Sequence, residues 1–365
     1  MVKLDVVRTA NAALADGTKP FVAVVAGGTA GIGEATVRAL AATFAGRGSE
    51  GEGRGFLRVY IVGRNQEAVR KIIAECTAVC PGGVFRFCRG DLSLLKEVDR
   101  VCAEITGIER READAKATPV KIDFLVCCQG VLSLTVEETE EGLDKYFSLY
   151  YYSRMRLIER LLPLLNASPN AGHVVSVFNS SVQSSLILND LTLRNPRNQT
   201  LQTRFAHWVG MTNVFMEELA HRNPGRLALC HYYPGYVPTG IAASSNFPWY
   251  LKFLVTYIIT PLFWPFRVPF EECGQRVLFM ASPARFPARE SGSAEMATGK
   301  VKGVEAAVGI DGKVGSGAYL VTKGDDTYGK EKKYEGVRAN GTTEKVYQHT
   351  TTVFAEIEAG RVYKD

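Results

Sequence analysis

Hydrophobic residues along this chain fall into short β-branched runs that alternate with longer stretches of helical period. The short runs predict strands at residues 21–25, 56–62, 84–89, 122–127, 173–178, 227–232 and 317–321. Between them, apolar residues recur three and four positions apart at residues 66–79, 94–111, 140–165 and 202–221, which predicts helices. Because strands and helices alternate, we expect an α/β fold with a doubly wound parallel sheet of about seven strands in three α/β/α layers.

Three polar or glycine-rich segments interrupt this alternation. Residues 46–55 and 283–316 are rich in glycine and charged residues, so we expect a surface loop and a loosely packed insertion. The tail after Lys323 predicts a terminal helix that begins at Thr342 or Thr343 and ends near Glu358. We therefore divide the chain into an N-terminal extension (residues 1–20), one domain (residues 21–323) and a C-terminal tail (residues 324–365).

The composition narrows the function classes. The 365-residue chain is 46% hydrophobic and 22% charged, which is typical of a soluble globular protein. Its net charge of +5 is spread along the chain, so no basic stripe indicates nucleic-acid binding. Eight cysteines without a signal-peptide pattern indicate reduced thiols and a cytoplasmic protein. The cysteines and histidines lack the spacing of a metal site, so we expect no metal.

The turn after the first predicted strand carries the clearest chemistry. It reads Ala-Gly-Gly-Thr-Ala-Gly-Ile-Gly at residues 26–33, and a helical pattern rich in Ala, Val and Leu follows it. Glycines let a backbone approach a pyrophosphate, and the start of a helix offers N–H groups and a positive dipole end. This strand–turn–helix unit predicts a Rossmann-type dinucleotide site, in which we expect the cofactor to contact Gly27, Thr29, Ala30, Gly31, Ile32 and Gly33.

The end of the second predicted strand bears on the choice of cofactor. An acidic side chain at this point binds the ribose hydroxyls of NAD, whereas an arginine neutralises the 2′-phosphate of NADP. The chain has Val-Gly-Arg-Asn at residues 62–65, with Arg64 and no carboxylate. We therefore favour NADP(H) over NAD(H); the alternative is that Arg64 is a solvated loop residue.

Further motifs follow later strands in order. They are Asp-Leu-Ser at residues 91–93, Cys-Cys-Gln-Gly at 127–130 and Pro-Gly-Tyr-Val-Pro-Thr at 234–239. With the glycine turn, they make residues 21–282 resemble a short-chain dehydrogenase/reductase, although that family has Asn-Asn-Ala-Gly where this chain has Cys-Cys-Gln-Gly. The resemblance implies further cofactor contacts by Asp91, Leu92, Gly130, Pro234, Gly235, Val237 and Thr239. Asp91 has an alternative role as a helix N-cap.

Shorter segments resemble one branch of that family. Ala-Asn-Ala-Ala-Leu at residues 10–14, Glu-Ala-Thr at 34–36 and Tyr-Tyr-Ser-Arg at 151–154 are similar to a divergent filamentous-fungal branch. That branch is often associated with secondary metabolism. The resemblance therefore implies an oxidoreductase of secondary-metabolite biosynthesis.

The expected catalytic residues are replaced. In the family, a tyrosine hydroxyl protonates the developing alkoxide, a lysine four residues later lowers its pKa, and a serine and an asparagine assist. Aligned on the family's helix, this chain has Phe205 at the tyrosine position and Val209 at the lysine position. The serine position falls on Asn179 and the asparagine position on Tyr150. The resemblance therefore implies a site without the usual proton relay.

Four polar residues near these positions are candidate replacements: Tyr150, Asn179, Ser180 and His207. Tyr150 is the strongest, because a phenol on the neighbouring helix could reach the substrate, but an aromatic core residue is an equal alternative. His207 points away from the Phe205 face of its helix, which favours a structural or solvated residue. Ser180 has the alternative of a bond to local backbone.

Three functions fit a chain that keeps the cofactor-binding motifs of the family but has lost its catalytic acid. The first is hydride transfer to an acceptor that is already cationic or that delocalises its charge, such as an iminium or an enone. The second is a non-redox isomerase or cyclase in which the pocket guides the reaction by shape. The third is a catalytically inactive nucleotide-binding protein. We rank hydride transfer first.

An aromatic segment at residues 247–266 lies inside an expected substrate lid at residues 241–267, and it favours a bulky lipophilic substrate. Lys252, Pro261 and Pro265 interrupt it, which argues against a transmembrane helix. A lid packed on its own domain is favoured, and contact with a membrane face is the alternative. Since family members commonly pair through the helices that here hold Tyr150 and Phe205, a homodimer is a further expectation.

Overall fold

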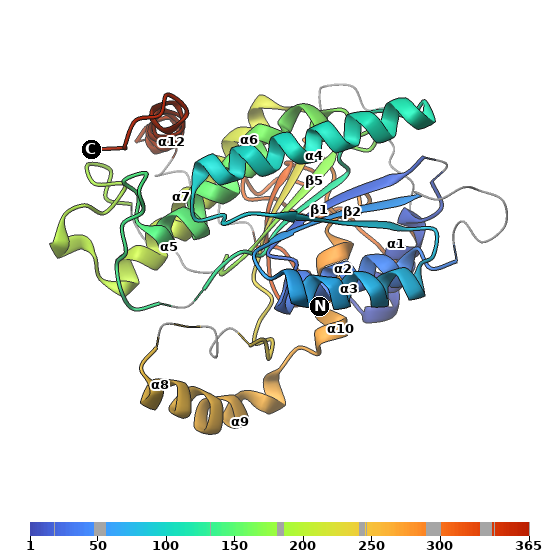
Figure 1. Ribbon diagram of the computed structural model, residues 1–365, viewed down its shortest axis with the longest axis horizontal. Helices are drawn as coiled ribbons and strands as arrows, with labels where there is room; N and C mark the ends of the chain where they lie inside the picture. Colours follow the sequence, from blue (N-terminus) through green and yellow to red (C-terminus); the bar gives the residue numbers. More distant parts are fainter. Residues whose placement is uncertain are drawn as a thin grey trace.

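Parallel strands form one central sheet in the order β3-β2-β1-β4-β5-β6-β7 (Figure 1). The computed structural model describes residues 1–17, 19–46, 56–131, 133–180, 186–240, 245, 247–289, 301–328, 338 and 340–364. Its strands are β1 (Phe21–Ala26), β2 (Leu57–Gly63), β3 (Val84–Arg89), β4 (Phe124–Cys127), β5 (Gly172–Val177), β6 (Leu227–Tyr232) and β7 (Ala318–Val321). The order reverses between β1 and β4, which is the topological switch point where ligands bind in such sheets.

Helices cover both faces of this sheet. One face carries α1 (Leu4–Leu14), α2 (Gly31–Thr43), α3 (Gln66–Val79) and α10 (Phe270–Phe279). The other carries α4 (Leu95–Lys116), α5 (Lys145–Phe147), the π-helix η1 (Ser148–Tyr152), α6 (Ser153–Asn166), α7 (Leu201–Arg222) and α12 (Thr342–Glu358). A 3-10 turn, η2 (Pro196–Asn198), precedes α7. The three-layer α/β/α architecture is therefore confirmed.

The two hydrophobic cores follow from the two-residue period of the strands. On β1, Val22, Val24 and Ala26 pack against the α4 face, whereas Ala23 and Val25 pack against the α2 face. All five side chains are fully buried. A parallel sheet buried on both faces has continuous apolar strands, which is the pattern that the sequence showed.

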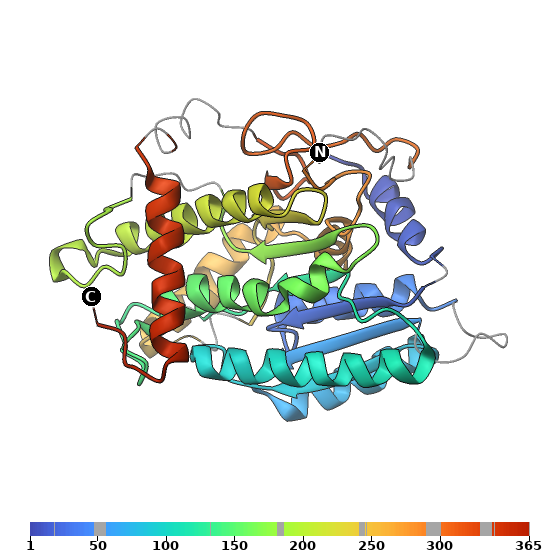
Figure 2. The same ribbon diagram turned by 90° about the horizontal axis from the view of Figure 1, so that it is seen from above.

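The C-terminal helix α12 lies across α4 and α7 on one outer face (Figure 2). Tyr347 stacks on Phe215 of α7 with ring centroids 5.4 Å apart, and Thr350 bonds to the hydroxyl of Tyr151 at 2.6 Å. His349 bonds to the hydroxyl of Tyr152 at 2.7 Å. The tail is thus part of the folded body and covers the helices through which pairing was expected.

The sequence predicted every strand of the sheet within about two residues, which is ordinary boundary error. It did not predict α1, and it treated residues 140–165 as one stretch, where the structure has α5, η1 and α6. Residues 301–316 were expected to pack loosely, but Ala307 and Ile310 are buried and bond to Arg285 and Ala318. Residues 47–55 and 290–300 lie outside the described residues.

A carboxylate between two arginines joins α4 to α6. Asp99 accepts from Arg156 at 2.7 and 2.8 Å and from Arg160 at 2.8 and 3.0 Å. Glu358 at the end of α12 pairs with the same arginines. Burial raises the pKa of Asp99, but the bonds and charges of both arginines outweigh burial and lower it below its usual value.

Removal of this charge gives a pH-dependent loss of stability. Because the folded-state pKa of Asp99 is depressed, its contribution is complete above the unfolded pKa and disappears as the pH falls through the folded pKa. We expect Asp99→Asn to lower the free energy of unfolding by about 1–3 kcal/mol at pH 7 and by much less near pH 3. Urea unfolding at both pH values measures this difference. Glu97→Gln, on the same helix, should change stability by less than about 0.5 kcal/mol; equal losses at both pH values for Asp99→Asn would contradict the prediction.

Candidate functional site

The glycine turn after β1 forms a tight cradle at the carboxyl edge of the sheet. Gly27 and Gly31 have positive φ angles of 78° and 58°, a conformation that L side chains rarely adopt. A Cβ on Gly27 would lie 2.7 Å from the backbone nitrogen of Gln129, and one on Gly33 would collide with the carbonyl oxygen of Gly27. Glycine is therefore required for the turn and for the close approach of α2 to β1.

The N-terminus of α2 is open to an anion. Ala30 is the N-cap residue, has extended backbone and has no side chain that could bond to the first-turn N–H groups. The N–H groups of Gly27 and Gly28 are instead held by the carbonyl of Val62, at 2.9 and 3.2 Å, which fixes the turn against β2. Uncapped N–H groups at the positive end of a helix suit a pyrophosphate.

At the adjacent strand ends, Arg64 and Asp91 face each other. Arg64 is largely exposed, and its Nη1 lies 3.7 Å from Oδ2 of Asp91. The other Asp91 oxygen accepts from the N–H and hydroxyl of Ser93, while Leu92 is buried. Arg64 is thus available for a new anionic partner beside a carboxylate.

The alternative role of Asp91 as a helix N-cap is wrong. The N-cap position of α4 is Leu94, which has no capping side chain. Glu141 supplies the cap from a distant loop, since its carboxylate accepts from the N–H groups of Leu95 at 2.6 Å and Lys96 at 2.8 Å. No local motif such as Ser or Asp before the helix marks this long-range cap.

The loop over the expected nicotinamide end closes onto the cradle. Gly235 has a φ of 74°, Val237 is buried, and a Cβ on Gly31 would lie 3.2 Å from Cγ2 of Thr239. The loop is held by the N–H of Val268, which donates to the carbonyl of Tyr236 at 2.8 Å. Residues from the ends of β1 and β6 therefore lie next to each other, and the cofactor contacts assigned to them stay predictions.

A buried arginine that sequence reasoning missed joins the ends of β4 and β5. Arg154 is 1% exposed and donates to the carbonyl oxygens of Gln129 at 2.7 Å and Val177 at 2.9 Å, and to the hydroxyl of Ser176 at 2.8 Å. Its Nε donates to the carbonyl of Leu149, in the widened turn of η1. Among the described residues no carboxylate pairs with it, and burial lowers its pKa.

Aromatic rings fill the region where the family's proton relay is expected. Tyr150 stacks on Trp208 with centroids 4.7 Å apart and lies 4.6 Å from the ring of Phe178. Phe178 in turn stacks on Phe205 at 5.5 Å. Val209, on the same helix as Phe205, is fully buried. The part of α7 at these positions therefore contributes apolar surface.

Two of the candidate acids have structural partners. The hydroxyl of Tyr150 donates to the carbonyl of Val131 at 2.9 Å, and burial raises its pKa. Ser180 is buried and donates to the carbonyl of Val321 at 3.0 Å, so its partner is on β7 and not the local backbone that we gave as an alternative. Asn179 follows β5 next to it and is partly exposed.

Two histidines near these positions are buried and have structural partners. His207 is fully buried, accepts from the N–H of Ile187 at 3.0 Å, and has a pKa lowered by burial. His207 is therefore a structural residue, which was one of the two alternatives that we gave for it. His231 on β6 bonds to Asn213 at 2.5 Å, and burial together with the charge of Arg154 lowers its pKa to about 3. Both rings are therefore neutral at pH 7.

Neither thiol chemistry nor a metal is indicated near the cradle. Burial raises the pKa of Cys127 to about 12, and it raises that of Cys128 as well, so neither is a thiolate nucleophile. All eight cysteines are free. Within the described ranges, no group of His, Cys, Asp or Glu side chains has the geometry of a metal site.

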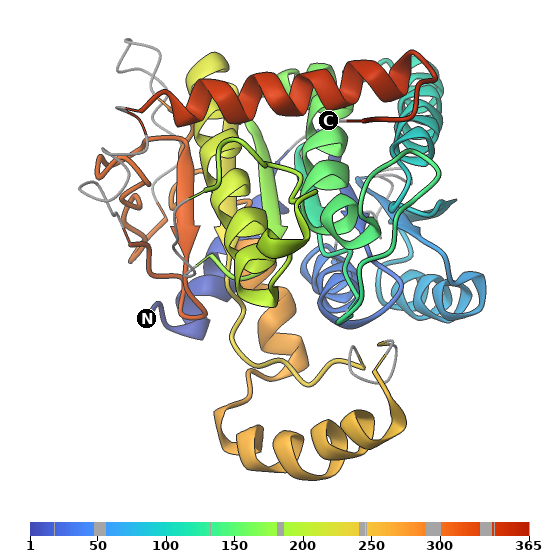
Figure 3. The same cartoon turned by 90° about the vertical axis from the view of Figure 1, so that its left-hand side faces the viewer.

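The expected lid does not pack on its own domain. It is formed by α8 (Trp249–Leu254), the π-helix η3 (Val255–Ile259), α9 (Thr260–Phe263) and the 3-10 turn η4 (Trp264–Phe266), and it stands away from the body (Figure 3). None of these residues is buried. The favoured interpretation is thus corrected; residues 241–244 and 246 of the lid lie outside the described residues.

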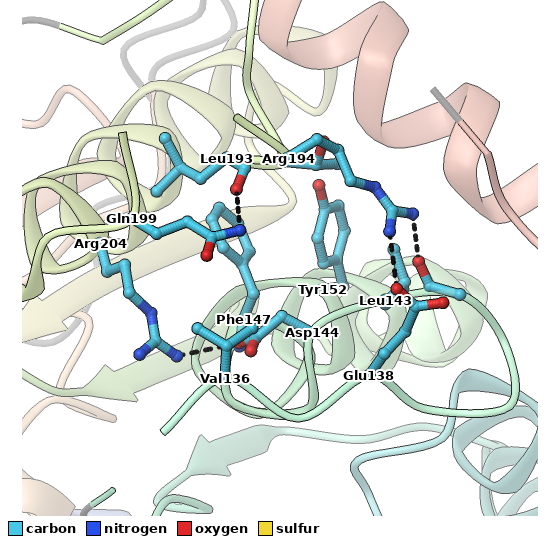
Figure 4. Close-up of a pocket in the computed structure, with 12 residues that line it drawn as sticks. Val136, Glu138, Leu143, Asp144, Phe147, Tyr152, Leu193, Arg194, Gln199 and Arg204 are labelled. Atoms are coloured by element: carbon cyan, nitrogen blue, oxygen red, sulfur yellow. Dashed lines mark hydrogen bonds and ion pairs between the residues drawn. The ribbon is translucent and has the colours of Figure 1, made fainter. Parts of the chain in front are cut away.

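A small cavity beside α5 and α7 is not a substrate site. Its volume is about 60 Å³, room for a few waters, and Figure 4 shows the side chains that enclose it. Arg194 closes one end through Glu138 and the carbonyl of Gly142, and Arg204 pairs with Asp144 at the other. These bonds tie loops together, and we assign the cavity no ligand.

Comparison with known proteins settles the family. A family model described as short chain dehydrogenase matches residues 21–189. An oxidoreductase of Emericella nidulans is 35% identical over 97% of this chain and 98% of its own length. The chain belongs to the short-chain dehydrogenase family. The short-chain dehydrogenase/reductase SAT2 of Stachybotrys chartarum is 34% identical, with 98% of each chain covered.

Solved short-chain dehydrogenases share the fold of this one. A 3-oxoacyl-[acyl-carrier protein] reductase from Brucella melitensis in complex with NAD matches with a TM-score of 0.50 and 20% identity. The match covers 73% of this chain and 91% of that chain. The resemblance to this family is therefore confirmed at the level of family and fold, and the roles of individual residues in this dehydrogenase stay predictions.

The close approach of Gly33 to Gly27 can be tested by mutation. We expect Gly33→Ala to push α2 away from β1, lowering the melting temperature by several degrees and dinucleotide affinity by at least about tenfold, because a rigid backbone has to move. Thermal melts and fluorescence titration with NADPH measure both effects. Gly46→Ala is the matched control, since a Cβ there meets no atom within 4 Å. Unchanged affinity in Gly33→Ala would refute the cradle.

Proposed function

We propose that this protein is an NADP(H)-dependent oxidoreductase that acts on a bulky lipophilic small molecule in secondary-metabolite biosynthesis, without the usual proton relay. One observation carries the proposal: the glycine turn packs against the 128–130 segment, whose Gly130 touches the ring of Tyr150, while apolar Phe205 and Val209 stand at the positions assigned to the catalytic tyrosine and lysine. The two fungal relatives, named as an oxidoreductase and a short-chain dehydrogenase/reductase, support the oxidoreductase class.

The absent acid limits the chemistry. A positioned proton donor typically contributes about 10²–10⁴-fold in rate, so ketone reduction without one is slow. In this site, Tyr150 and Ser180 hold backbone carbonyls and His207 is neutral. An acceptor that needs no proton at the reacting centre avoids this loss, and an iminium or an enone meets that requirement. We therefore assign the substrate to this class of lipophilic acceptors.

The observed aromatic cluster also favours a second candidate. Apolar rings beside a bound nucleotide can hold a reactive intermediate in one conformation and guide an isomerisation or cyclisation, with the nucleotide in a structural role. An inactive nucleotide-binding protein is the remaining alternative. Hydride transfer ranks first because it uses the cradle and the nicotinamide loop together.

Two finer expectations belong to this proposal. We place the protein in the cytoplasm, because its eight cysteines are all free thiols. A homodimer through η1 and α7, which hold Tyr150 and Phe205, meets an obstacle, since α12 bonds to Tyr151 and Tyr152 and stacks on Phe215. Any pairing of two copies would use another surface.

Arg64 provides the test of cofactor choice. Its guanidinium would exchange the 3.7 Å contact with Asp91 for the 2′-phosphate of NADP, which is a stronger charge-assisted pairing. We expect Arg64→Asp to weaken NADPH binding by about 100-fold and NADH binding by less than about threefold, because the new carboxylate repels the phosphate. Fluorescence titrations with both nucleotides measure the two effects. Equal losses for NADPH and NADH would contradict the assignment.

Isotope transfer tests the reaction class. With NADPH that carries deuterium at both C4 positions, we expect the label to appear in the product from an iminium or enone acceptor, while the absorbance of reduced nicotinamide falls in step. Mass spectrometry of the product measures the transfer. Substrate conversion with tight NADPH binding but no label would establish the non-redox alternative, and absence of any conversion across lipophilic ketones, enones and iminium precursors would favour the inactive one.

The variant Tyr150→Phe tests whether Tyr150 acts as a proton donor or only packs in the core. Since its hydroxyl donates to Val131 and its ring is buried, we expect the variant to keep kcat/KM within about threefold of the parent. Steady-state kinetics with the acceptor that transfers label measures this. A loss of 100-fold or more, with a changed pH profile, would identify Tyr150 as the missing acid.

A further inference from the structure

The segment Trp249–Phe266, called here the apolar projection, leaves an unusual amount of hydrophobic surface uncovered. Trp249 is 80% exposed, Tyr257 67% and Leu262 68%. Figures 1 and 3 show the projection standing beyond the carboxyl edge of the sheet, apart from the other helices. Monomeric proteins rarely expose contiguous apolar patches of this kind unless the patch has a partner.

The projection is apolar on more than one side. Leu251, Val255 and Ile259, spaced four residues apart, form a partly covered side. The more exposed side chains include Trp249, Tyr250, Phe253, Leu254, Tyr257, Ile258 and Leu262. A closing movement onto the site would cover one side only, so it does not account for the other.

Its attachment to the body is narrow. The backbone bridge between Tyr236 and Arg267 and the contact of the rings of Tyr236 and Phe263, at 6.1 Å, join it to the loop over the cofactor cradle. Arg267 also covers the ring of Trp264, 4.2 Å from its centroid. The helical segment is therefore presented outward from a fixed base.

The charge pattern favours an anionic surface as the partner. Lys252 and Arg267 are the charged residues of the segment and its edge, and the sequence has no Asp or Glu between Glu218 and Glu271. Tryptophan and tyrosine, here Trp249, Tyr250, Tyr257 and Trp264, are the side chains that favour the interface between headgroups and acyl chains. Anionic headgroups would complement the two cations.

The shape also fits a bilayer. The projection is convex and lies at one extremity of the molecule, so a flat surface can receive it without contact with the body. Among the described helices, none has the length and apolar character to cross a membrane. Insertion would therefore be shallow, with the segment lying in the plane of the interface.

We propose that the apolar projection docks the protein on the surface of a lipid bilayer that contains anionic lipids. Docking places the carboxyl edge of the sheet, with the cofactor cradle, next to the acyl region. A lipophilic substrate can then reach the site without crossing water; that last step rests on the proposed function, whereas docking itself does not.

The test uses the full chain without cofactor or substrate, so its outcome is independent of the redox proposal. Phosphatidylcholine vesicles with and without phosphatidylserine are the probe, and binding is measured by flotation. We expect binding that is about tenfold tighter with phosphatidylserine, since two basic residues adjoin the surface. Brominated lipids should quench Trp249 and Trp264, while Trp208 is buried in the aromatic cluster.

Substitutions that introduce a negative charge inside and outside the apolar projection test which surface binds the vesicles. Leu262→Glu and Tyr257→Glu should each reduce vesicle binding at least tenfold. Val314→Glu, at a side chain that is 64% exposed and lies outside the projection, should leave it unchanged. Melting temperatures should stay the same, because these positions make few packing contacts.

Three results would overturn the proposal. One is absence of binding to both kinds of vesicle. Another is vesicle binding that Leu262→Glu and Tyr257→Glu do not reduce. The third is self-association in the absence of lipid, measured by sedimentation, that the same variants abolish, which would identify a second copy of the chain as the partner.

Discussion

The close contact between the start of α2 and the turn after β1 is the constraint on which the rest of the site depends. Gly33 approaches the carbonyl of Gly27 so closely that no Cβ fits, and Gly27 itself lies against the backbone of Gln129. These contacts place the open N-terminus of α2 at the switch point between β1 and β4. Thr239 of the loop after β6 and Gly63 at the end of β2 also lie against this turn.

Around that contact, polar groups serve the architecture more than the chemistry. Arg154 uses its donors on carbonyls and a hydroxyl at the ends of β4 and β5, and Ser180 and Tyr150 also hold backbone carbonyls. A buried cation with fixed partners is a costly element, which the fold tolerates because it joins three chain segments at once. These bonds give the described part of the site shape and rigidity, and they occupy the hydroxyls of Tyr150 and Ser180, which is why we propose acceptors that need no proton.

Two peripheral helical segments, α12 and the apolar projection, differ in whether the rest of the chain covers their apolar side chains. On α12, Val353 and Phe354 are buried, and its last turn is tied to Arg156 and Arg160 through Glu358. The apolar projection has comparable apolar side chains, but none of them is buried. One segment thus completes the fold, and the other presents a surface to something outside it.

The sequence by itself determined the local elements and the cradle, because these follow from short-range pattern: β-branched runs for the strands, glycines at a strand–helix junction, and Arg64 at a strand end. It did not show the cap that Glu141 supplies to α4, the role of Arg154, or the partners of Tyr150 and His207, since each depends on residues brought together from distant parts of the chain. Nor could the hydrophobic periodicity of residues 247–266 show whether this lid packs on the domain, because a packed lid and an exposed lid are both apolar helices. Only the tertiary structure decided these points, since a side chain's role there is set by what lies beside it in space.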